Sequence, residues 1–188
     1  MNLVRGLCGL GLALAAAAVQ ALPQHEPVPG GVAVIDLAAA GAAAPTANWG
    51  EQRLAVLEAG GRWVALLGIP LDTAPGELEI SVFSGSTARV KKIQVRSKAY
   101  PEQRLTIKDK RKVDPDPDDL ARIAREREVT DAVKRRFSEP VPDTAFVLPA
   151  NGPLSSRFGL RRIFNGQPRN PHAGLDVAVG AGVPVRAP

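Results

Sequence analysis

Residues 77–83 read Glu77-Leu-Glu-Ile-Ser-Val-Phe83 and contain the clearest strand pattern in the chain. The apolar side chains of Leu78, Ile80 and Val82 alternate with polar ones. Successive side chains of a strand point to opposite faces, so this segment has one apolar face and one polar face. A strand of this kind packs one side on a core and leaves the other in water.

Short stretches rich in β-branched residues continue this pattern on both sides, separated by turn residues. We predict further strands at 32–37, 53–58, 62–67, 88–95 and 104–108. Gly60-Gly61 lies between two of them and predicts a tight hairpin, because adjacent glycines can both adopt positive φ. Regularly spaced short strands are typical of an all-β sandwich. We therefore expect a mainly β fold, with a β-sandwich-like amino-terminal domain over residues 22–112.

A charged linker and a connecting helix are predicted over residues 113–140. Asp116 suits the N-cap and Pro117 the first helical position. The helix should extend to about residue 137, and Pro140 and Pro142 should end it. Residues 141–188 then return to a turn-rich β pattern with too few strands to bury a sheet face, so we expect them to be the first strands of an incomplete domain.

The first 21 residues resemble a secretory signal peptide. Arg5 precedes an uncharged apolar stretch from Gly6 to Val19, which is shorter than the ~20 residues of a membrane-crossing helix. We expect cleavage after Ala21 and no retained transmembrane helix; an uncleaved leader is the alternative. Cys8, the single cysteine, lies inside this leader, so the mature chain can form no disulfide.

The net charge of +5 falls to +4 when Arg5 leaves with the leader. Such a charge favours an anionic polymer or is simply that of a solvated surface. Secretion and an aromatic content of 4% argue against nucleic acid, because few side chains are available for base stacking.

The segment His172-Ala-Gly-Leu-Asp176 is the candidate metal centre. Imidazole and carboxylate are ordinary zinc ligands. Residues four apart on an ideal strand are ~13 Å from each other, so one ion can touch both only if the chain bends, and Gly174 is the place for a bend. The pair alone also fits a turn histidine with no metal.

The surrounding residues resemble the start of the LytM/lysostaphin-type zinc metallopeptidase domain. The resemblance covers about Pro149 to Pro188 and rests on four stretches in the family's order and spacing. They are Leu154-Ser-Ser-Arg-Phe-Gly159, Arg161-Arg162, Asn165 to Asp176, and Gly182-Val-Pro-Val-Arg-Ala-Pro188. More loosely, the upstream part with Gly30, Trp63 and Tyr100 is similar to the region that precedes this domain in some Gram-negative members. That region is expected to position or shield the catalytic cleft.

The resemblance implies a Zn²⁺ site in which His172 is the first ligand and Asp176 the second. It implies a third ligand and a catalytic histidine in later strands, which we expect downstream of Pro188. His25, beside the leader, matches no part of the motif and is expected to be exposed. Phe158 is expected in a core and Gly159 in a turn.

The resemblance further suggests that Arg161, Arg162 and Asn170 bind substrate. The two arginines are equally well explained as solvated residues, and Asn170 as the start of an Asn-Pro turn. Ser155 and Ser156 form no nucleophile elbow, because the Gly-x-Ser-x-Gly frame is absent.

The function implied is a secreted, periplasmic metalloendopeptidase that hydrolyses the peptide stems of peptidoglycan, truncated here and so without activity. A non-catalytic LytM-like regulator that binds the wall or a partner hydrolase is the alternative. A structural β-sandwich adhesion module is a third.

Overall fold

The computed structural model describes residues 22–41, 43–139 and 146–187. The predicted signal peptide and the two prolines expected to end the helix, Pro140 and Pro142, lie outside these residues. None of the helices in the described ranges is long and apolar enough to cross a membrane.

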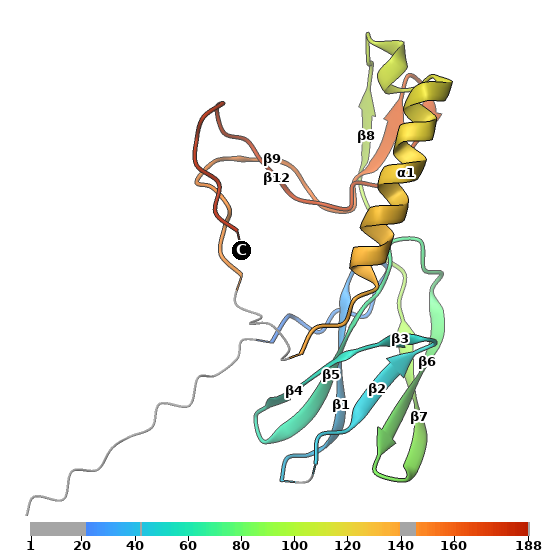
Figure 1. The fold of residues 1–188 in the computed structure, drawn as a ribbon, viewed down its shortest axis with the longest axis vertical. Helices are drawn as coiled ribbons and strands as arrows, with labels where there is room; N and C mark the ends of the chain where they lie inside the picture. Colours follow the sequence, from blue (N-terminus) through green and yellow to red (C-terminus); the bar gives the residue numbers. More distant parts are fainter. Residues whose placement is uncertain (1–21, 42, 140–145, 188) are drawn as a thin grey trace, which may run out of the picture.

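Two antiparallel sheets form the amino-terminal unit (Figure 1). The first has the order β1-β5-β4, with β1 at Val32–Ala39, β5 at Arg62–Gly68 and β4 at Ala55–Ala59. The second has the order β3-β2-β6-β7, with β3 at Gln52–Arg53, β2 at Thr46–Trp49, β6 at Gly76–Ser84 and β7 at Thr87–Val95.

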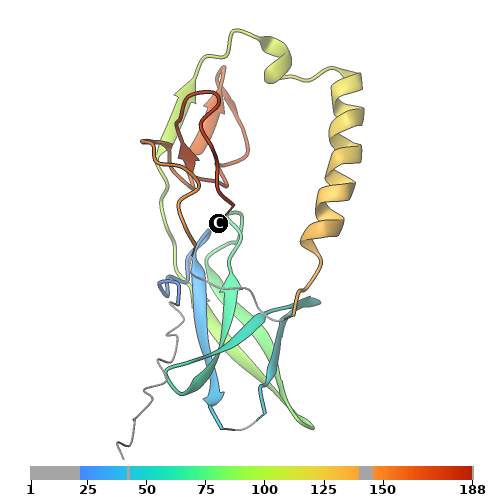
Figure 2. The same cartoon turned by 60° about the vertical axis from the view of Figure 1, so that its left-hand side comes forward.

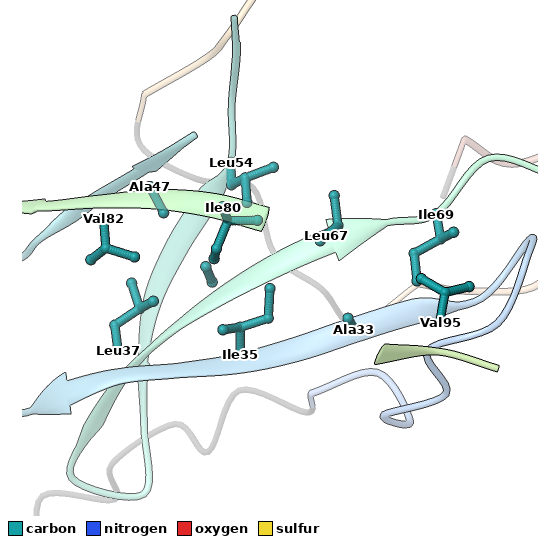
Figure 3. Packing of buried hydrophobic residues seen from close by; sticks show 11 residues of the cluster. Ala33, Ile35, Leu37, Ala47, Leu54, Leu67, Ile69, Ile80, Val82 and Val95 are labelled. Atoms are coloured by element: carbon teal, nitrogen blue, oxygen red, sulfur yellow. The ribbon is translucent and has the colours of Figure 1, made fainter. Parts of the chain in front are cut away.

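One apolar core lies between these sheets (Figure 3). The face predicted from residues 77–83 is part of it, because Ile80 is 1% exposed and Val82 is fully buried, whereas Glu77 and Glu79 are exposed. Side chains from both sheets complete the cluster: Ala33, Ile35, Leu37, Ala47, Leu54, Ala65, Leu67, Ile69 and Val95. The predicted sandwich-like packing is confirmed.

Side chains of β7 bridge the open edge between the sheets. Lys91 donates to the carbonyl oxygen of Asp36, and Arg89 donates to that of Leu37 at 2.5 Å. Both carbonyls belong to β1, an edge strand of the other sheet, so these cations link the two sheets through backbone acceptors.

The predicted helix is present as α1, Pro117–Lys134, after the short 3-10 helix η1 at Lys110–Lys112. The Asp116 carboxylate accepts a hydrogen bond from the backbone N–H of Asp119 at 3.0 Å, which confirms the N-cap. The helix ends short of residue 137. No residue of α1 is buried, and Figure 2 shows it standing to one side of the sheets.

The carboxyl-terminal part is built from four short strands and one strand from upstream. The three-stranded sheet has the order β11-β10-β8, with β11 at Gln167–Pro168, β10 at Arg161–Phe164 and β8 at Glu102–Leu105. A second pair joins β9, Leu154–Ser156, to β12, Asp176–Val177.

The placement of β8 differs from the prediction. The strand expected at 104–108 starts at Glu102 and pairs in parallel with β10, about sixty residues away in sequence, instead of joining the sandwich. The described part of the chain is mainly β with one α-helix, as predicted.

Candidate metal centre

Strand pairing and a bend bring the two predicted metal ligands together. β12 pairs antiparallel with β9, which places Asp176 opposite Ser156. The chain bends at Gly174, as predicted, and Asp176 opens the strand that follows. That strand ends at Val177.

The backbone of His172 is fixed by the turn before β10. The N–H of His172 donates to the carbonyl of Leu160 at 2.9 Å, and the N–H of Gly159 donates to the carbonyl of His172 at 2.7 Å. Gly159 has φ +84°, which confirms the predicted turn, because this conformation is costly for residues with a Cβ.

His172 and Asp176 face each other. The Nε2 atom of His172 lies 3.2 Å from Oδ1 of Asp176. The imidazole is buried, whereas half of the Asp176 side chain is exposed. The pair is therefore held from the protein side and open on the solvent side.

The other ring nitrogen fixes the tautomer of His172. Its Nδ1 lies 3.0 Å from the carbonyl oxygen of Arg157 and 3.0 Å from the hydroxyl oxygen of Ser156. A carbonyl oxygen can only accept, so Nδ1 carries a proton, and in the neutral imidazole Nε2 then presents its lone pair to Asp176. Metal-binding histidines are commonly oriented in this way by a partner on the second nitrogen.

The two groups fit a zinc ion in type and spacing. Two ligands each about 2.1 Å from a tetrahedral zinc are about 3.4 Å apart, close to the observed separation. A proton on Nε2, or a cation such as Zn²⁺ bound between the two atoms, would satisfy both groups at this separation. In number they fall short, because catalytic zinc sites have three protein ligands. Within the described ranges no group of three His, Cys, Asp or Glu residues could hold a metal.

The three predicted substrate-binding residues are placed differently from one another. Arg162 is partly buried and its guanidinium lies 3.9 Å from Oδ2 of Asp176. Arg161 and Asn170 are exposed and, among the described residues, form no hydrogen bond or ion pair with the metal pair. The structure therefore brings only Arg162 to the candidate centre.

Sequence reasoning missed Ser156 as a member of the site. It is 8% exposed and supports His172 rather than acting as a nucleophile. The sequence signal for this role was that Ser156 lies within Leu154–Gly159, one of the stretches that carry the family resemblance. The expectation for Phe158 was wrong: it is 39% exposed, because its ring packs edge-on against Tyr100 rather than inside a core. His25 is exposed as predicted, although its Nδ1 accepts from the N–H of Val34.

Comparison with known proteins identifies a peptidase family that this chain resembles. Residues 25–98 match the peptidase family M23 N-terminal domain. A crystal structure of a Pseudomonas aeruginosa protein assigned to peptidase M23 is similar with 38% sequence identity and a TM-score of 0.65, over 87% of the present chain. The chain belongs to peptidase family M23. The resemblance to the LytM/lysostaphin type is thereby confirmed.

The M23 chain spans 60% of the length of that P. aeruginosa structure. No curated protein matches the sequence. His172 and Asp176 lie outside the segment matched by the family N-terminal domain, so their assignment as metal ligands depends on the geometry described above.

Proposed function

We propose that this M23 chain belongs to a secreted zinc metalloendopeptidase that hydrolyses the peptide cross-links of bacterial peptidoglycan. The observation that carries the proposal is the 3.2 Å approach of Nε2 of His172 to the Asp176 carboxylate. The family resemblance assigns these two positions to the first and second zinc ligands.

The chain's own residues would hold and orient the metal. His172 Nε2 and Asp176 Oδ1 would bind it, while Ser156 and the Arg157 carbonyl keep the imidazole in the required tautomer. A bound zinc would polarise the scissile carbonyl and lower the pKa of a water to about 7. The family resemblance places the third ligand and the catalytic histidine in later strands.

Features of the sequence support the proposed compartment and substrate class. A leader-like amino terminus and a mature region without cysteine are compatible with an exported, periplasmic protein. The net positive charge favours approach to an acidic wall polymer. Arg162, beside Asp176, is positioned to meet a carboxylate of a peptide stem.

Zinc titration tests the metal site directly. Zinc binding by residues 22–188 should be measurable by NMR, and His172→Ala combined with Asp176→Ala should abolish it. The matched control is His25→Ala, which removes the other histidine and should leave zinc uptake intact. Unchanged uptake after the double substitution would contradict the proposal.

Hydrolysis is tested with the full-length gene product. Purified peptidoglycan incubated with zinc-loaded protein should release new amino termini, and His172→Ala should stop this release. Zinc binding without any release of amino groups would instead identify a non-catalytic wall-binding regulator.

A further inference from the structure

Tyr100 lies at the junction between the sandwich and the segment that carries the metal pair. Its hydroxyl donates to the carbonyl oxygen of Pro29 at 2.8 Å, which ties it to the amino-terminal unit. Its ring meets Phe158 of the carboxyl-terminal part edge-on, with centroids 6.4 Å apart and planes at 77°. Such edge-to-face pairs contribute beyond simple burial.

Two glycines show how closely this junction is packed. A Cβ added at Gly159 would lie 2.1 Å from the Tyr100 ring, so the ring occupies the space that any other residue would need. A Cβ at Gly30 would lie 2.7 Å from the Phe158 ring and 2.9 Å from the Tyr100 hydroxyl. We call Gly30, Tyr100, Phe158 and Gly159 the Tyr100 junction.

The Tyr100 junction is connected to the metal ligand by backbone hydrogen bonds. Gly159, which packs on the Tyr100 ring, donates its N–H to the carbonyl of His172 at 2.7 Å. The next residue, Leu160, accepts from the N–H of His172 at 2.9 Å. A shift of the Gly159 turn would therefore displace both backbone hydrogen bonds of His172, the proposed metal ligand.

The residue after Tyr100 strengthens the same connection. The carbonyl of Pro101 accepts from the N–H of Arg161 at 2.9 Å, and β8 then pairs with β10. The amino-terminal unit thus supplies both a side chain under the Gly159 turn and an adjoining strand.

We propose that Tyr100 is a positioning residue for the metal centre, through which the amino-terminal domain sets the place of His172. The predicted effect on zinc affinity depends on the zinc site proposed above. The structural link between Tyr100 and His172 can be tested without metal. In this proposal the amino-terminal domain determines the position of a metal ligand and does not only stabilise the fold.

The two histidines of the chain make NMR a selective test. The imidazole Hε1 signal of His172 reports on the site, and that of exposed His25 serves as an internal reference. Tyr100→Ala removes the ring, and Tyr100→Phe keeps the ring and removes only the bond to Pro29. Val82→Ala, in the sandwich core, is the control for general destabilisation.

In residues 22–188 without metal, Tyr100→Ala should shift the His172 signal and leave that of His25 in place. Zinc affinity should fall about tenfold, as expected when support around a ligand is lost. Tyr100→Phe should also shift the His172 signal and lower zinc affinity, but by less than Tyr100→Ala. Val82→Ala should lower stability without moving the His172 signal.

Unchanged His172 shift and zinc affinity in a folded Tyr100→Ala protein would overturn the proposal. If Tyr100→Ala does not fold, Tyr100→Phe decides by the same two readouts. If the wild-type chain takes up no zinc, the proposed metal site fails, whereas the metal-free His172 shift still decides whether Tyr100 positions that residue.

Discussion

The Nδ1 atom of His172 and the hydroxyl oxygen of Ser156 lie 3.0 Å apart, with both residues buried. Replacing Ser156 by alanine leaves the Arg157 carbonyl as the remaining partner of Nδ1 and frees the ring to tilt. We expect Ser156→Ala to weaken zinc binding by about 10-fold, at the low end of the effect of losing an outer partner of a metal ligand. NMR titration with Zn²⁺ measures this change.

The neighbouring serine provides the matched control. Ser155 is exposed and lies on the same strand, so Ser155→Ala makes the same chemical change beside the site. Its zinc affinity should equal that of the wild type. Equal losses of zinc affinity in Ser155→Ala and Ser156→Ala would mean that the hydroxyl of Ser156 does not orient His172.

Arg162 places a positive charge beside a proposed metal ligand. Its guanidinium is 3.9 Å from Asp176, where it competes with a cation for the carboxylate. We expect Arg162→Gln to raise zinc affinity roughly two- to fivefold, because partly exposed charge pairs contribute about 0.2 to 1 kcal/mol. Zinc titration at low ionic strength measures the gain.

Arg161, the exposed neighbour on β10, is the control for net charge. Arg161→Gln should leave zinc affinity close to the wild-type value. The gain in Arg162→Gln should shrink in 1 M salt, where the Debye length is about 3 Å. A loss of affinity in Arg162→Gln would show instead that the arginine holds Asp176 in its binding position.

Local patterns predicted β1, β4, β5, β6 and β7 and the start of the helix, because their signals are contained in a few adjacent residues, whereas the short strands β2 and β3 were not predicted. The alternation at 77–83 fixed which face is buried, and Asp116 fixed the helix start. The partner of β8 could not be predicted, since alternation tells which face of a strand is apolar but not which distant strand it joins.

For the candidate site, the residue types and the bend at Gly174 limited where a metal could bind. The contacts around His172 could not be predicted from the sequence, because they arise from the pairing of β9 with β12 and from the Gly159 turn. The exposure of Phe158 was missed for a similar reason: an aromatic residue does not reveal that its neighbour in space is Tyr100.

Ile80 tests whether one core stabilises the amino-terminal unit. The side chain is 1% exposed and lies between the two sheets. Ile80→Ala should lower the free energy of unfolding by about 2 to 5 kcal/mol, through lost burial and the cavity left behind. Urea denaturation followed by tryptophan fluorescence measures the loss.

Val90, on the adjacent β7 strand, is the control because it is 57% exposed. Val90→Ala should change the free energy of unfolding by no more than about 0.5 kcal/mol. Similar losses in the two variants would contradict the assignment of Ile80 to a packed core.

The ion pair between Asp36 and Arg62 predicts a pH dependence of stability. Both guanidinium contacts are short, at 2.7 and 2.6 Å, and they lower the pKa of Asp36 below its ordinary value of 3.8, with Lys91 and Arg89 adding to the effect. A carboxyl with a lowered pKa in the folded state stabilises the protein fully above its unfolded pKa. That contribution is lost as the pH falls through the folded-state pKa.

Asp36→Asn should therefore be slightly less stable than the wild type at pH 7. The free energies of unfolding of the two proteins should converge as the pH falls below about 4. The difference should be small, because both side chains are about half exposed, and salt should reduce it further. Urea denaturation at several pH values measures the gap in the free energy of unfolding. Asp72→Asn, at an exposed position between β5 and β6, is the matched control and should show no such convergence. A gap between wild type and Asp36→Asn that stays constant down to pH 2 would mean that the charge of Asp36 is not what stabilises the fold.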